Sequence, residues 1–212
     1  MKEKTKRTYL GIFNLCLALT VLLSWLYMLF FGHGEQLSSV GLRSLRYYTV
    51  LSNLFAGAAA AAYGILLLAG KSAGPAIRAL KLYSAGTVMV TFSVVVVFLG
   101  PLFGYPLMYR GANLTFHLIV PLAAAAEYVL ADGFGRLPFP RVLPALIPTA
   151  VYGTVYLTNI LVNGAEGNDF YFFAHWGIPF GLLIFAAILL LNLGLCCLIN
   201  RLAGPAERRK SR

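Results

Sequence analysis

A threonine and a histidine in separate apolar segments are the residues of this 212-residue chain best suited to chemistry. Thr49 lies in SLRYYTVLSNL (residues 44–54) and His117 lies in HLIVP (residues 117–121). A threonine hydroxyl is a weak nucleophile until a base removes its proton, and histidine titrates near neutral pH. The pair could therefore attack an ester carbonyl. The same two residues could instead form a buried hydrogen bond that only holds two helices together.

Polar side chains accompany both residues. Written as a helix, the first stretch places four of them on one face: Arg46, Thr49, Ser52 and Asn53. Arg46 is a candidate for holding a substrate carboxylate, although a snorkelling arginine at the membrane interface would have the same sequence signal. Ser52 is a further candidate substrate contact. Asn53 or Asn113 could donate a hydrogen bond to an oxyanion or orient the imidazole.

Other candidate groups lie farther along the chain. The predicted helices carry no Asp or Glu at the depth of the threonine, so a third carboxylate would come from a loop, with Asp169 as the candidate. Asn159 and His175 are further candidate substrate contacts, and His175 also fits an aromatic interfacial segment. A haem held by His117 and His175 would require the two rings to face each other. We predict no metal site and no cofactor.

The composition identifies a membrane protein. Hydrophobic residues make up 59% of the chain and charged residues 11%, and the mean hydropathy is +0.78. Crossing a bilayer core of ~30 Å takes ~20 apolar residues. Six segments meet this length: 9–32, 45–70, 80–100, 113–131, 142–162 and 172–199. We predict an all-α polytopic fold, a single domain of six transmembrane helices over residues 1–212, with basic cytoplasmic ends at 1–8 and 200–212.

The basic residues predict the orientation of the chain. Of its 17 Lys and Arg residues, the outer segments would hold only Arg43, Arg46 and Arg110 if the amino terminus is cytoplasmic. This positive-inside bias places both termini in the cytoplasm and favours contact with anionic membrane lipids, so nucleic acid is not an expected partner. The short chain with basic ends fits an integral protein of a bacterial plasma membrane.

The predicted orientation gives the two reactive residues a common depth. The second and fourth helices both run inward, and Thr49 and His117 each lie four residues, or ~6 Å, beyond the predicted start of the helix. We therefore predict a joint site near the outer leaflet. Glu127 lies ~15 Å farther along the fourth helix and is expected to pair with an inner cation such as Lys81.

Two stretches resemble a known family. RYYTVLSNL and HLIVP are similar to segments of the androgen-induced-gene proteins and the androgen-dependent tissue-factor-pathway-inhibitor-regulating proteins, with their bacterial relatives. The resemblance maps that family's essential threonine to Thr49 and its histidine to His117. It implies an integral membrane hydrolase of fatty acid esters of hydroxy fatty acids. Helix order is similar over most of the chain, but the connection between the motifs is shorter than in the animal proteins and the polar residues around His117 differ.

The leading hypothesis is thus a membrane lipid esterase with a Thr49–His117 dyad. The alternative is a transporter or lipid-binding protein that uses the same polar cavity without covalent chemistry. That alternative draws on the intramembrane Glu127 and on the likeness of YGTVYLTNI in the fifth helix to YYTVLSNL in the second, which would fit an inverted repeat.

Overall fold

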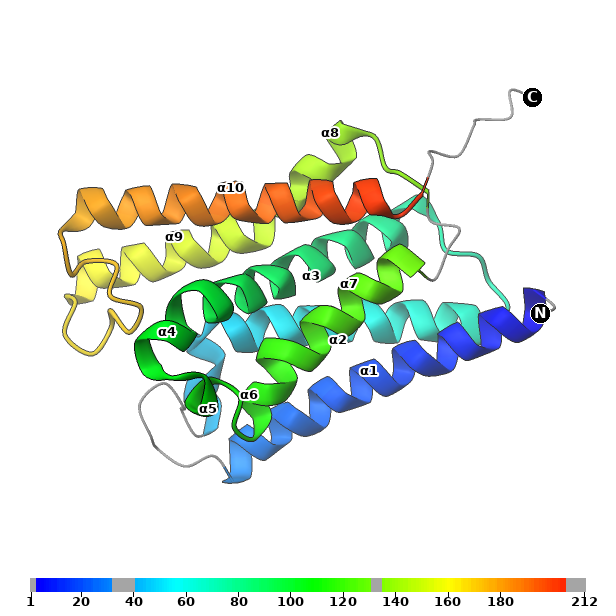
Figure 1. Cartoon of the computed structure of the whole chain (residues 1–212), viewed down its shortest axis with the longest axis horizontal. Coiled ribbons are helices and arrows are strands. Elements are labelled where there is room, and N and C mark those ends of the chain that lie inside the picture. Colours follow the sequence, from blue (N-terminus) through cyan, green and yellow to red (C-terminus); the bar gives the residue numbers. More distant parts are fainter. Residues whose placement is uncertain (1–2, 32–40, 131–134, 205–212) are drawn as a thin grey trace.

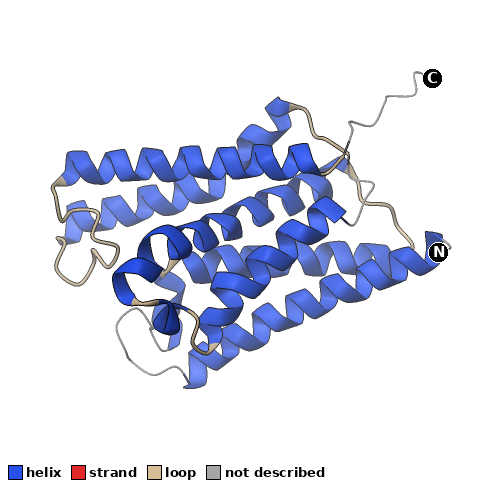
Figure 2. Ribbon diagram, viewed as in Figure 1, coloured by secondary structure: helices blue, strands red, loops and turns tan. Residues whose placement is uncertain are grey.

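The computed structural model of the chain describes residues 3–31, 41–130 and 135–204. Within these ranges the protein is a bundle of helices without strands, as Figures 1 and 2 show. Six helices are long and apolar enough to cross a membrane, which confirms the predicted all-α fold with six spanning segments. The start of the first helix and the end of the last lie at the same end of the bundle (Figure 1). Which side of a membrane that end faces remains a prediction.

The spanning segments are built from the following elements. The first two are α1 (Glu3–Phe31) and α2 (Tyr48–Leu68), with the 3-10 turn η1 (Gly41–Arg46) before α2. The third and fourth contain π-helical turns: α3 (Pro75–Val94), η2 (Val95–Leu99) and α4 (Gly100–Phe103), then α5 (Tyr105–Met108), α6 (Ala112–Leu114), η3 (Thr115–Ile119) and α7 (Val120–Leu130). The last two comprise α8 (Phe139–Val142), η4 (Leu143–Ala145), α9 (Leu146–Asn163) and α10 (Ile178–Leu202).

Helix α3 lies at the centre and packs against α2, α7 and α10. Helix α1 packs along α2, where small residues let the two backbones approach closely. A Cβ added at Gly64 would lie 2.9 Å from the Gly11 carbonyl oxygen, and one at Gly57 would lie 2.9 Å from Val21. The small-residue face predicted for the second helix therefore does point into the protein.

Several predicted boundaries are wrong. The first and third helices begin at Glu3 and Pro75 rather than at residues 9 and 80. The second spanning helix begins at Tyr48 rather than residue 45, because the residues before it form the separate turn η1. The third continues to Phe103 through a π turn. The sixth begins at Ile178 rather than residue 172, since Phe172 and Gly177 have positive φ angles of 60° and 89° that a helix cannot contain. Predicted ends at 32 and 131, and residues 1–2 and 205–212 of the basic ends, lie outside the described residues.

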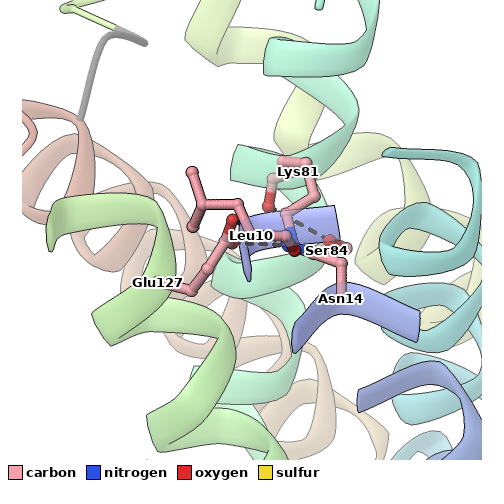
Figure 3. A network of polar contacts seen from close by, with 5 residues as sticks. All are labelled: Leu10, Asn14, Lys81, Ser84 and Glu127. Atoms are coloured by element: carbon pink, nitrogen blue, oxygen red, sulfur yellow. Dashed lines mark hydrogen bonds and ion pairs between the residues drawn. The ribbon is translucent and has the colours of Figure 1, made fainter. Parts of the chain in front are cut away.

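A buried polar cluster joins α1, α3 and α7, as Figure 3 shows. The Lys81 Nζ lies 2.8 Å from the Glu127 Oε2, and both side chains are 2% exposed. Asn14 closes the cluster by accepting from Lys81 at 2.7 Å and donating to Glu127 at 3.1 Å. The predicted Glu127–Lys81 pairing is confirmed. Because Glu127 pairs with Lys81 and Asn14 within the helix bundle, it no longer supports the transporter alternative.

Candidate active site

Thr49 occupies the first turn of α2, at the end of the bundle that carries η1, α5 and α6 (Figure 1). Tyr47 precedes the helix in an extended conformation (φ −88°, ψ 135°), so the chain turns sharply between η1 and α2. The prediction that Arg46 shares one helical face with Thr49 is therefore wrong. The Arg46 guanidinium is exposed, lies 4.7 Å from the centre of the Phe170 ring, and donates to the Tyr47 hydroxyl at 3.1 Å.

His117 lies in the π turn η3, and the backbone there has a local cause. Pro121 has no N–H to donate to the His117 carbonyl four residues earlier. The Val120 N–H instead bonds to the Thr115 carbonyl five residues back, which is the π pattern. This turn buries the imidazole, which is 6% exposed.

A backbone carbonyl fixes the orientation of the imidazole. The His117 Nδ1 lies 2.7 Å from the carbonyl oxygen of Met108, in the short helix α5. A carbonyl oxygen can only accept, so in the neutral ring Nδ1 carries the proton and Nε2 carries the lone pair. His117 is thus held in the tautomer that a general base acting through Nε2 requires.

A small cavity of about 30 Å³ brings the predicted residues together. Thr49, Asn113 and His117 all line it, beside apolar side chains of α1, α2 and η2. No hydrogen bond joins Thr49 directly to His117 in the described part of the chain. The cavity is large enough for one water molecule, which needs ~10–15 Å³. Thr49 and His117 therefore border one common space that could hold a single water molecule.

A second, much larger cavity of about 1030 Å³ begins on the other side of Thr49. It lies among α3, α4, α9, α10 and the loop before α10, and apolar and aromatic side chains form most of its wall. Its lining includes no Lys, Arg, Asp or Glu from the described residues. Val97 (76% exposed) and Trp176 (63% exposed) belong to both this lining and the outer surface of the bundle. The large cavity is therefore an uncharged chamber that reaches the side of the bundle.

Three residues, Thr49, Leu99 and Tyr171, line both cavities and form the wall between them. Tyr171 is a site residue that the sequence reasoning missed. Its segment, YFFAHWG (residues 171–177), is the aromatic segment predicted to lie at the interface around His175, and an interfacial segment and a cavity wall have the same composition. The loop from 164 to 177 is instead folded onto the bundle, because Asp169 accepts hydrogen bonds from the Tyr156 hydroxyl and from the backbone N–H groups of Phe173 and Ala174.

The side chains of Asn53 and Ser52 donate hydrogen bonds to backbone carbonyls near the site. The Asn53 Nδ2 donates to the carbonyls of Thr49 (2.7 Å) and Phe116 (3.1 Å), which ties α2 to the π turn that carries His117. Both amide hydrogens are used in this way, so Asn53 has none left for an oxyanion or for the imidazole. Ser52 donates to the Thr49 carbonyl at 3.1 Å and is absent from the lining of both cavities.

The remaining candidates lie farther from the two reactive residues. Asn159 bonds to Asn163 and Asn168 at the end of α9, outside both cavities. His175 is exposed and lines the large chamber, with its ring centre 4.9 Å from that of Trp176. His117 and His175 line different cavities, so they do not face each other across one space as a haem would require.

The arrangement combines a threonine hydroxyl, an imidazole with a fixed tautomer and an apolar chamber beside them. These are the elements that acyl transfer from a lipid needs. The predicted third carboxylate is not beside the histidine, because Asp169 is engaged within its own loop and the Met108 carbonyl holds the Nδ1 proton. Comparison with protein-family models, with curated proteins and with solved structures found no match for this chain.

Proposed function

We propose that this protein is an integral membrane esterase that hydrolyses lipid esters through Thr49 and His117. One observation carries the proposal: Thr49 stands in the wall between a small cavity that His117 lines and a large apolar chamber. An acyl chain in the chamber would bring its ester carbonyl to the threonine hydroxyl. The base that activates the hydroxyl would then lie on the opposite side, clear of the chain.

The reaction follows from this arrangement. His117 takes the Thr49 proton through Nε2, directly or through one water molecule in the small cavity, and the oxygen attacks the ester carbonyl. The tetrahedral intermediate collapses as the imidazolium returns the proton to the leaving alcohol oxygen. A water molecule, deprotonated by the same nitrogen, then attacks the acyl-threonine. Its hydrolysis gives the carboxylic acid and restores the hydroxyl.

The chamber favours a particular class of substrate. Burying a charge among apolar side chains is costly, so a wall without charged residues favours the uncharged part of a lipid. The exposed rim at Val97 and Trp176 lies within or next to the apolar spans, where a bilayer lipid could enter from the side. With the predicted orientation, the site faces the outer leaflet. The family resemblance makes fatty acid esters of hydroxy fatty acids the first substrates to test.

The decisive experiment compares wild type with Thr49→Ala and His117→Ala in detergent micelles. Lipid-ester hydrolysis and covalent labelling by an alkyl fluorophosphonate are measured. We expect Thr49→Ala to abolish labelling, and His117→Ala to slow it by about 10²-fold to 10⁴-fold, the contribution of a general base. Thr154→Ala, at an exposed position outside both cavities, is the matched control. Equal labelling of wild type and Thr49→Ala would refute the proposal.

A lipid-binding or transport function is the second candidate, and the chamber itself favours it. A cavity of about 1030 Å³ with an opening at the side of the bundle could hold a lipid whether or not Thr49 reacts. Binding of a fluorescent fatty acyl ester, or its movement between leaflets of vesicles, distinguishes the two. The second candidate predicts full binding or transport by Thr49→Ala and no hydrolysis by wild type.

A further inference from the structure

Two hydroxyls meet in the wall of the large chamber, one from α2 and one from α9. The hydroxyl oxygens of Tyr48 and Thr149 lie 2.7 Å apart, and both residues line the chamber. Thr149 is 2% exposed, and its oxygen accepts a hydrogen bond of 2.6 Å from the buried Asn192 amide of α10. Contacts among three helices therefore fix this hydroxyl pair in place.

The pair carries one proton more than its hydrogen bonds use. Asn192 donates both amide hydrogens, one to the Thr149 oxygen and one to the Ala145 carbonyl. Each of the two hydroxyls also carries one proton, and the single bond between them uses only one of these. Whichever hydroxyl donates in that bond, the proton of the other has no acceptor among the hydrogen bonds of the described residues. An unpaired donor in a buried site is unfavourable, so this proton favours a ligand that can accept it.

A second pair of hydroxyls beside the chamber has no proton to spare. The Ser52 proton goes to the Thr49 carbonyl at 3.1 Å, so Thr91 must be the donor in its 3.1 Å contact with the Ser52 oxygen. Thr91 lines the chamber and is 3% exposed, so its burial matches that of Thr149. A surplus proton is therefore not a general property of buried hydroxyls in this wall, and Thr91 is a matched control.

We propose that the Tyr48–Thr149 pair is a binding site for an uncharged carbonyl oxygen of a lipid in the chamber, such as that of an ester or a ketone. A carbonyl oxygen accepts a hydrogen bond without bringing a proton of its own. A carboxylate could also accept, but the described residues of the lining include no Lys or Arg to offset its charge. Ligand pockets commonly combine apolar walls with a few polar groups that orient the ligand. The site serves either candidate function, because it requires binding and not hydrolysis.

The test measures binding in micelles and uses Thr49→Ala as the parent protein, so that no ester is hydrolysed. A long-chain methyl ketone and the alkane of equal chain length each compete with the fluorescent fatty acyl ester. The ratio of the two affinities is compared between variants, so the different solubilities of the ligands in detergent cancel. We expect Tyr48→Phe/Thr149→Val to lower the ketone-to-alkane ratio by about 5-fold to 100-fold, and Thr91→Val to leave it unchanged. An unchanged ratio in the double variant would overturn the inference.

Two single variants locate the donor. A lower ratio in Tyr48→Phe assigns the donated proton to the phenol, whereas an unchanged ratio there, with the loss confined to the double variant, assigns it to Thr149. Either result supports the site. Ser93 is a half-buried residue of α3 that also lines the chamber, so its hydroxyl is the rival donor. If Ser93→Ala removes the preference for the ketone and the double variant keeps it, the inference is wrong.

A spectroscopic measurement needs no change at the pair. Hydrogen bonding lowers the stretching frequency of a carbonyl group, so an isotope-labelled ketone bound to the parent protein should absorb at a lower infrared frequency than in protein-free micelles. Equal frequencies would overturn the inference even if the double variant failed to fold. An unchanged alkane affinity shows that a variant is folded with its chamber open. Hydrolysis by wild type tests the esterase proposal separately, so the two proposals fail in distinguishable ways.

Discussion

Removal of one charge from the buried cluster of α1, α3 and α7 should destabilise the bundle strongly. In Lys81→Met, the Glu127 carboxylate loses a cation 2.8 Å away and keeps the Asn14 amide at 3.1 Å. The Asn14 Oδ1 also loses a donor at 2.7 Å. Leaving a buried charge without its ionic partner costs about 3–5 kcal/mol. We expect the free energy of unfolding to fall by about that amount.

Removing both charges should cost less than removing one. The double variant Lys81→Met/Glu127→Leu replaces the pair by apolar side chains, a change that is often neutral or stabilising. The Asn14 Oδ1 would remain without its donor, at a cost of about 1–3 kcal/mol. The double variant is therefore expected to unfold at an SDS fraction between those of wild type and Lys81→Met.

Unfolding by SDS in mild-detergent micelles, followed by tryptophan fluorescence, measures these differences. Lys71→Met, at an exposed position after α2, is the matched control. Glu127 lies ten residues from His117, ~15 Å along the helix axis, so the folded fraction of each variant should retain its phosphonate labelling. If Lys81→Met and Lys71→Met unfold at the same SDS fraction, the pair does not stabilise the bundle and the reasoning is refuted.

Three further changes test the supports of the site and the packing of α1. Asn53→Ala removes the side-chain donor of the buried Phe116 carbonyl and one of the donors of the Thr49 carbonyl, which keeps Ser52. It should lower stability by about 1–3 kcal/mol and slow phosphonate labelling, both read in micelles. Asp169→Ala removes the acceptor that holds the 164–177 loop, and faster hydrogen exchange of that loop should accompany slower labelling. Gly64→Val places a Cβ 2.9 Å from a carbonyl oxygen of α1 and should cost about 1–3 kcal/mol in SDS unfolding, whereas Gly194→Val meets nothing within 4 Å and should be tolerated.

The spanning helices could be predicted because bilayer-length apolar runs are a strong and continuous signal. Their ends were harder to predict, as the second helix illustrates. Arg46, Tyr47 and Tyr48 fit a helix, an interfacial turn or a 3-10 segment equally well by composition. The observed break depends on long-range contacts, since the Arg46 carbonyl accepts from Tyr152 and the Tyr48 N–H donates to Tyr171. Neither contact leaves a local trace in the sequence.

The depths of Thr49 and His117 were equally hard to predict by counting residues. Counting placed Thr49 and His117 equally far from their helix starts, but Thr49 is the second residue of α2, and His117 follows α6 within a π turn. Both nevertheless line one cavity. The Asn53 side chain aligns α2 with the π turn η3, because it donates to the carbonyls of Thr49 and Phe116. This is a tertiary contact, which cannot be predicted by counting residues.

Among the described residues no carboxylate contacts His117, which fits the location of the proposed site. A buried carboxylate would add a second charge in a region of low dielectric, where each charge needs its own partner. The Met108 carbonyl gives the same control over the tautomer without a net charge. In the proposed mechanism, a carbonyl dipole stabilises the imidazolium less than a carboxylate would, so the other transition-state contacts would carry more of the catalysis.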